Sequence, residues 1–196
     1  MRVFYTAIAA VFILASCAAL PPQKEVIPEF PQPPEHIMGK GTVPEEQLAA
    51  FLLDTNAGAD GDFVRQLSAY YVEEAAAEGI NHDTAFAQMC LETGFLRYGG
   101  LVTPDMNNFC GLGAIGPEQP GLVFPDARSG VRAHIQHLQA YASVEPLNQD
   151  LIDPRYRYVK RGSSPTIHGL AGTWAADRAY SGKIGAILQR LYEFAH

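Results

Sequence analysis

The chain has 196 residues, with 14 lysines and arginines against 21 aspartates and glutamates, which gives a formal net charge of −7 at pH 7. This acidity, with no basic stripe to offset it, excludes nucleic acid as the main partner. The part that follows residue 41 has the right length for one domain.

Residues 1–16 have the build of a secretory signal peptide. Arg2 supplies a positive charge, and the apolar run that follows is too short to span a bilayer, since a spanning helix needs about 20 residues. The next residues, Leu14-Ala15-Ser16-Cys17, resemble the lipobox of bacterial lipoproteins, in which the cysteine is acylated and becomes the new N-terminus. We therefore expect a lipid on Cys17. The alternative is an ordinary signal peptide that is cleaved after Ala18 or Ala19.

Residues 17–41 predict a flexible, proline-rich tether between the lipid and the domain over residues 42–196. Few apolar residues separate the prolines, so the segment cannot bury enough surface to offset its ordering entropy. Fully extended, at about 3.1 Å per residue, it would reach roughly 70 Å. No aspartate follows Cys17 to signal retention in the inner membrane, so in a cell with two membranes we expect anchoring to the periplasmic side of the outer membrane.

The domain is expected to be mainly α-helical. Apolar periodicity and capping residues predict helices over about 44–54, 62–79, 81–94, 126–141, 164–174 and 181–194. Thr42-x-x-Glu45 has the form of a capping box for the first of them. Between residues 97 and 125, dense Gly and Pro predict a loop or small irregular hairpin, with a short helix near Asn107. The expected fold is a helical bundle around a cleft, with this insertion after the third helix.

Glu92 has the most suggestive local environment in the chain. It is placed at the C-terminal end of the third predicted helix, among apolar neighbours such as Phe86 and Leu91. The negative end of the helix dipole and the apolar surroundings both disfavour ionisation, so the pKa of Glu92 should rise. A raised pKa suits a general acid. The alternative, from these residues alone, is a surface glutamate at a helix end.

Three segments occur in an order that resembles a known family. They are Gln88-Met-Cys-Leu-Glu92-Thr-Gly-Phe, Asn107-Asn108-Phe-Cys-Gly111-Leu and Trp174-Ala-Ala-Asp177-Arg-Ala-Tyr180-Ser-Gly-Lys-Ile184. Together they resemble the glucosaminidase domain of bacterial autolysins and flagellar wall hydrolases, within the lysozyme-like superfamily. The resemblance spans about residues 63–194.

This resemblance implies a peptidoglycan hydrolase that cleaves a β-1,4 bond after N-acetylglucosamine. Glu92 falls on the family's catalytic glutamate, which would protonate the leaving glycosidic oxygen. Tyr180 falls on a tyrosine of the cleft, where its phenol would position the acetamido group or the attacking water. The expected partners are glycan strands and, through the lipid, a membrane. We expect a monomer without cofactor or metal.

The resemblance also proposes residues that bind the glycan. They are Asn107, Asn108, Phe95, Trp174 and Asp177. Three of these residues have a structural alternative. The two asparagines could hold the cleft floor through backbone hydrogen bonds, and Trp174 could be a core residue.

A second carboxylate is harder to find. An inverting mechanism needs a base about 6.5–9.5 Å from the acid. The insertion offers Glu118 as the catalytic candidate and Asp105 as another. If neither serves, the substrate's own acetamido group could attack. Two further functions stay open, namely glycan binding without cleavage and lytic transglycosylation.

The remaining cysteines and histidines give weaker signals. Cys90 and Cys110 could form a disulfide or remain as buried thiols. His134 and His137 lie three residues apart on a predicted helix, but no third metal ligand accompanies them, so we expect them on a solvated helix face.

The lipid anchor leads to the first prediction. Mass spectrometry of the mature N-terminus should find a diacylated or triacylated Cys17, because one chain alone gives only marginal membrane binding. Cys17→Ala should move the protein from the detergent phase to the aqueous phase. An unmodified N-terminus at any residue after Cys17 would show that the anchor does not exist.

Overall fold

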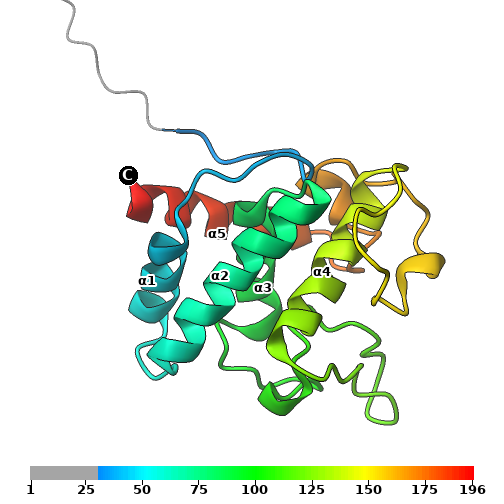
Figure 1. The fold of residues 1–196 in the computed structure, drawn as a ribbon, viewed down its shortest axis with the longest axis horizontal. Coiled ribbons are helices and arrows are strands. Elements are labelled where there is room, and N and C mark those ends of the chain that lie inside the picture. Colours follow the sequence, from blue (N-terminus) through cyan, green and yellow to red (C-terminus); the bar gives the residue numbers. More distant parts are fainter. Residues whose placement is uncertain (1–30) are drawn as a thin grey trace, which may run out of the picture.

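The computed structural model describes residues 31–196, and its regular structure is helical (Figure 1). The helices are α1 (Glu45–Thr55), α2 (Gly61–Glu78), α3 (His82–Thr93), α4 (Ala127–Ala142) and α5 (Tyr180–Ala195), with short 3₁₀ turns η1 (Pro104–Met106), η2 (Tyr156–Tyr158) and η3 (Ile167–Leu170). Within these residues, extended pairing is limited to isolated bridges. The mainly α class is therefore confirmed. The predicted signal peptide and Cys17 lie outside the described residues.

Helix α3 is the centre of the domain. It contacts each of the other four α-helices, and ten of its 12 residues are buried. Asn81 caps its N-terminus, where the side-chain oxygen accepts from the backbone N–H of Thr84. Gly94 ends it in the left-handed conformation, which glycine adopts without strain. A helix that is buried over most of its length needs partners for its polar groups inside the protein.

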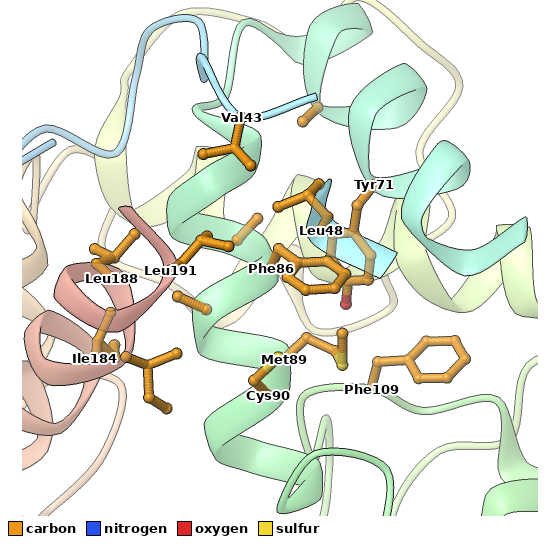
Figure 2. Packing of buried hydrophobic residues seen from close by; sticks show 14 of the residues in the cluster. Val43, Leu48, Tyr71, Phe86, Met89, Cys90, Phe109, Ile184, Leu188 and Leu191 are labelled. Atoms are coloured by element: carbon orange, nitrogen blue, oxygen red, sulfur yellow. The ribbon is translucent and has the colours of Figure 1, made fainter. Parts of the chain in front are cut away.

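Apolar side chains from all parts of the domain pack around α3, as Figure 2 shows. Phe86 and Met89 of α3 lie among side chains of α1, α2 and α5, including Leu48, Tyr71 and Leu188. Phe86 and Tyr71 meet edge to face with ring centroids 5.7 Å apart. This core fixes the direction in which α3 presents its C-terminal end.

The segment before α1 is bound to the other end of α3. Asp83 is fully buried and accepts from the backbone N–H groups of Thr42 (2.8 Å) and Val43 (3.2 Å) and from the hydroxyl of Tyr192 (2.8 Å). Burial alone would raise the pKa of Asp83, but hydrogen bonds from His82 and from the Thr42 backbone outweigh it and hold the pKa below its ordinary value. The Asp83 carboxylate therefore links α3 to α5 and to the segment that precedes α1 through hydrogen bonds.

The folded part begins earlier than residue 42, the predicted boundary. Ile37 is fully buried, its N–H donates to the carbonyl of Pro165, and Met38 forms a bridge with Ile80. The short apolar pair Ile37-Met38 gave no periodic signal in the sequence, although the burial of Ile37 fixes this stretch on the domain. The C-terminal part of the predicted tether is thus packed on the domain.

Two local expectations were wrong. The capping box at Thr42 and Glu45 does not form: Pro44 precedes α1 without a side-chain cap, and the Thr42 hydroxyl contacts Tyr192 instead. The helix predicted over residues 164–174 is only the 3₁₀ turn η3, because Ser164 bonds to the carbonyl of Gly169 and closes the segment into a compact loop.

The insertion after α3 has the predicted irregular form. The short helix expected near Asn107 is η1, directly before it. Beyond it the chain makes a tight turn, where Ile115 donates to the carbonyl of Gln119, and Leu122 pairs back to Leu112. No helix among the described residues is long and apolar enough to cross a membrane.

The close approach of the insertion to α4 leads to the second prediction. A Cβ on Gly130 would lie 1.7 Å from the carbonyl oxygen of Asn107, so Gly130→Ala should lower the free energy of unfolding by about 2 kcal/mol or more. Gly185, in α5, has no atom within 4 Å of the same position. Gly185→Ala should raise stability by about 0.5–1 kcal/mol, through helix propensity alone. Urea unfolding measures both. Equal changes in the free energy of unfolding of the two variants would contradict the close contact between Gly130 and the Asn107 carbonyl.

Candidate active site

Glu92 extends from the last turn of α3 toward the start of α5. Its Oε1 accepts from the indole Nε1 of Trp174 at 3.1 Å and from the hydroxyl of Tyr180. Trp174 comes from the loop after η3, and Tyr180 is the first residue of α5. The end of α3 and the segment 174–180, which are far apart in the sequence, thus meet at one carboxylate oxygen.

The surroundings of Glu92 favour its neutral form. The residue reaches solvent, but its carboxyl group is enclosed by protein atoms on the side of α5. Burial of the carboxyl raises the pKa of Glu92, and the hydrogen bonds from Tyr180 and Trp174, which favour the charged form, only partly offset it. Burial, together with the charge of Glu92, also raises the pKa of Tyr180, so the phenol stays protonated as a donor.

A cavity of about 190 Å³ opens beside Glu92. Its lining combines the end of α3 with the chain that follows it and with the insertion: Glu92, Thr93, Tyr98, Gly100, Leu101, Val102, Asn108, Gly111 and Ala114. Pockets that enclose drug-sized ligands measure about 300–1,000 Å³. The cavity beside Glu92 is smaller than such pockets. Glu92 is the one carboxylate among these lining residues.

A left-handed turn carries the chain from α3 into the cavity wall. Gly94, Phe95 and Leu96 have φ values of 58°, 57° and 61°, and Tyr98 follows at 57°. Side chains rarely adopt this region, and each such residue costs on the order of 1–3 kcal/mol unless its surroundings enforce it. Here the backbone bonds from Phe95 to Cys90 and from Tyr98 to Thr93 hold the turn. This turn places Tyr98 beside Glu92.

Behind Glu92 a line of buried polar groups crosses the domain. The amide nitrogen of Gln88 donates to the Tyr180 hydroxyl at 2.8 Å, and its amide oxygen lies 3.0 Å from Nε2 of His134. Nδ1 of His134 lies 2.9 Å from the hydroxyl of Tyr71. Gln88 and Glu92 share a face of α3 because they are four residues apart. The line therefore connects α2, α4, α3 and α5 through side chains.

The paired asparagines have structural contacts. Asn108 is buried, its amide nitrogen donates to the carbonyls of Leu112 (2.9 Å) and Leu122 (3.0 Å), and its oxygen accepts from the N–H of Leu112 (3.0 Å). Asn107 donates to the carbonyl of Phe124 at 3.1 Å. Asn108 thus holds the cavity floor, which is the structural alternative for these residues.

Two of the predicted glycan contacts point elsewhere. The ring of Phe95 packs on Phe51 of α1, with centroids 5.9 Å apart, and it does not line the cavity. Asp177 pairs with Lys183 at 2.7 Å and accepts from the N–H of Ala179, so it shapes the entry to α5. Trp174 does lie at Glu92, and its ring also packs on His137 and Tyr141.

The structure does not bring a second carboxylate into the cavity. Glu118 is exposed on the tight turn of the insertion and does not line the cavity. Asp105 is also exposed, and it accepts from the hydroxyl of Thr103 at 2.6 Å. Neither candidate base accompanies Glu92 in this conformation.

Of the two alternatives for the cysteines the structure shows the free thiols, whereas the expectation for His134 was wrong. Cys90 and Cys110 are both buried free thiols. His134 is fully buried, so its predicted place on a solvated helix face is wrong, while His137 pairs with Asp153 at 2.7 Å. Residues 31–196 contain no group of three or more side chains arranged to hold a metal ion.

Sequence reasoning did not assign four residues to this site. Gln88 was noticed only as part of the motif, although its place one turn before Glu92 was a usable signal. His134 was considered only as a metal ligand together with His137, and Tyr71 and Tyr98 had no local signal of function. They reach the site through tertiary contacts between α2, α4 and the turn after α3.

Comparison with known proteins places this geometry in a family. Residues 68–193 match the Glucosaminidase family, described as mannosyl-glycoprotein endo-beta-N-acetylglucosaminidase. An uncharacterized protein of Borreliella burgdorferi is 40% identical over 158 residues, which cover 81% of this chain and 78% of that protein. The crystal structure of S. aureus autolysin E in complex with the muropeptide NAM-L-Ala-D-iGlu superposes with a TM-score of 0.51 and 12% identity, over 81% of this chain and 71% of that one, and so shares its fold. The family match covers more than half of the chain, which therefore belongs to the glucosaminidase family.

Proposed function

We propose that this protein is a peptidoglycan hydrolase of the cell envelope, which cleaves a β-1,4 glycosidic bond of the glycan strand with Glu92 as general acid. The observation that carries the proposal is a carboxyl group whose pKa is raised by burial and which opens on a cavity. A raised pKa keeps a larger share of the carboxyl groups protonated at a given pH, and a protonated carboxyl can pass its proton to the leaving oxygen. Membership of the glucosaminidase family and the muropeptide held by autolysin E support the substrate class.

The lining of the cavity bears on the rest of the mechanism. Because Glu92 is the one carboxylate there, we propose that the acetamido group of the N-acetylated sugar attacks the anomeric carbon as Glu92 protonates the leaving oxygen. The glycosidic C–O bond breaks, and the acetamido oxygen forms a bond to the anomeric carbon. Water then opens this ring, and the Glu92 carboxylate takes the proton of that water, which restores the acid. Attack by a hydroxyl of the same sugar in place of water would make the protein a lytic transglycosylase.

Location completes the proposal. We propose that a lipid on Cys17 holds the domain at a membrane and that the chain between them places the domain at the wall. The folded part begins near Ile37, so the free part of the tether is shorter than residues 17–41. About 20 residues at 3.1 Å each still span roughly 60 Å.

Substitution of the proposed acid is the third prediction. Glu92→Gln keeps the shape of the side chain but removes its proton, so the release of reducing ends from peptidoglycan should fall about 10²–10⁴-fold. Glu118→Gln should keep its activity, because that side chain is exposed and outside the cavity. Full activity of the Glu92 variant would refute the role of Glu92, and loss of activity in the Glu118 variant would identify a second carboxylate.

The fourth prediction concerns the pH profile. Glu92 works in its protonated form, so activity is lost as the pH rises through its pKa. Tyr180→Phe removes a donor that favours the carboxylate, so the pKa of Glu92 should rise and the basic limb of kcat/KM should move to higher pH. Trp174→Phe removes the second donor and should move the limb in the same direction. A shift to lower pH in either variant would contradict the hydrogen bonds to Oε1.

Binding without cleavage is a second candidate function, and the single carboxylate in the cavity favours it. A protein that only binds would sediment with insoluble peptidoglycan and release no new reducing or anhydro-sugar ends. Mass analysis of the products from whole sacculi separates the three outcomes, because a hydrolysed product is heavier than an anhydro product by one water.

A further inference from the structure

The buried line behind Glu92 has a direction that its atoms determine. The amide oxygen of Gln88 can only accept, so Nε2 of His134 donates to it. His134 is fully buried, and burial lowers its pKa to about 3, so the ring is neutral and its Nδ1 accepts from the hydroxyl of Tyr71. The amide nitrogen of Gln88 then donates to Tyr180, and Tyr180 donates to Glu92. Every donor in the line points toward Glu92.

Hydrogen bonds in the opposite direction would change which oxygen of Glu92 carries the acidic proton. If the Gln88 amide turned over, its oxygen would accept the hydroxyl proton of Tyr180, and Glu92 would lose that donor. A protonated Oε1 of Glu92 could then itself donate to Tyr180. The orientation of one buried amide therefore decides whether Oε1 is an acceptor or carries the acidic proton.

We propose that His134 is a positioning residue for Glu92, because it fixes the Gln88 amide so that Tyr180 donates to Oε1 and the catalytic proton resides on Oε2. This inference rests on the proposed role of Glu92 as general acid. Oε2 is the oxygen that faces the insertion, since a Cβ on Gly111 would lie 4.0 Å from it, and Gly111 lines the cavity. Oε1 is already occupied by two donors, Trp174 and Tyr180.

The fixed direction helps the chemistry as well as the geometry. When Glu92 gives up its proton, the new carboxylate finds the Tyr180 donor already in place. Hydrogen bonds to a charged group are worth about 1.5–3 kcal/mol. A donor that waits in position needs no reorganisation during the proton transfer.

The titratable groups around the line do not supply another explanation. Near Glu92, burial raises the pKa of Tyr98 to about 12 and raises the pKa of the Cys110 thiol, so both stay neutral. On α4, His137 lies next to His134 and is paired with Asp153. Its charge, when present, disfavours protonation of His134 and so supports the neutral ring.

Kinetics of the full-length chain in detergent, on soluble glycan-strand fragments, provide the test. His134→Leu removes the donor to Gln88, and kcat should fall about tenfold with KM unchanged. The basic limb of the pH profile should move to higher pH, because the Glu92 carboxylate loses its oriented donor. His134→Gln offers an amide N–H near the position of Nε2 and should restore both kcat and the limb.

Two further variants keep the test valid if the leucine variant is unstable. Tyr71→Phe removes the donor to Nδ1 and should move the limb in the same direction by a smaller amount, because His134 then loses its tautomer preference. The matched control is Tyr192→Phe, whose hydroxyl is hydrogen-bonded to Asp83 at the other end of α3. It should lower stability and leave the limb unchanged.

A measurement without turnover separates this inference from the proposed function. Nitrogen NMR should show His134 protonated at Nε2, and carbon NMR of labelled glutamate should show Glu92 titrating at higher pH in the His134→Leu variant. If the wild type releases no glycan ends, the function fails while these spectra still report on the line. An Nδ1-protonated His134, or an unchanged Glu92 titration in both the His134→Leu and Tyr71→Phe variants, would overturn the inference.

Discussion

A helix that is mostly buried needs partners for the polar groups that it carries into the interior, and α3 is such a helix, although the described residues provide no partner for the buried hydroxyl of Thr84. Buried donors and acceptors that lack partners cost about 1–3 kcal/mol each. Asp83 and Gln88 on α3 are buried, and the structure provides partners for both from distant segments. The entering chain, α4 and α5 are therefore tied to α3 through its polar side chains as well as through the apolar core (Figure 2).

The same helix shifts the pKa values of two carboxyl groups in opposite directions. Asp83 is in its first turn, where the helix dipole favours negative charge and two backbone N–H groups and His82 point at the carboxylate. Glu92 is in its last turn, where the dipole opposes charge and where neutral Tyr180 and Trp174 donate to a single oxygen. The pKa is lowered at the first position and raised at the second. In the proposed function, these two environments separate a structural carboxylate, Asp83, from the general acid, Glu92.

Much of the fold and the central site residue followed from the sequence, for reasons that can be named. Asn81, Gly94 and Asp126 mark helix ends where the structure has them, because capping is local chemistry. Glu92 could be chosen as the candidate acid from the sequence, because its position at the helix end and its apolar neighbours are also local features. His134 was misplaced although it lies three residues after Val131 and four before Leu138, on the buried stripe of α4. The periodicity indicated burial, but the residue type suggested solvent, and only the tertiary partners Gln88 and Tyr71 make a buried imidazole acceptable.

The insertion shows why residue type alone did not identify a second carboxylate for the candidate site. Its base is fixed: Asn108 bonds to the backbone of Leu112 and Leu122, and the Asn107 carbonyl packs against Gly130 with no room for a side chain. Its tip is exposed, with Ile115 at 72% of its surface accessible and Glu118 beside it. The rigid part therefore supplies backbone and small residues to the cavity, while the carboxylate that a sequence motif would favour lies on the exposed part. A wall of this kind can shape and orient a sugar without taking part in proton transfer, so in the proposed function the insertion would contribute selectivity and the chemistry would depend on α3 and α5.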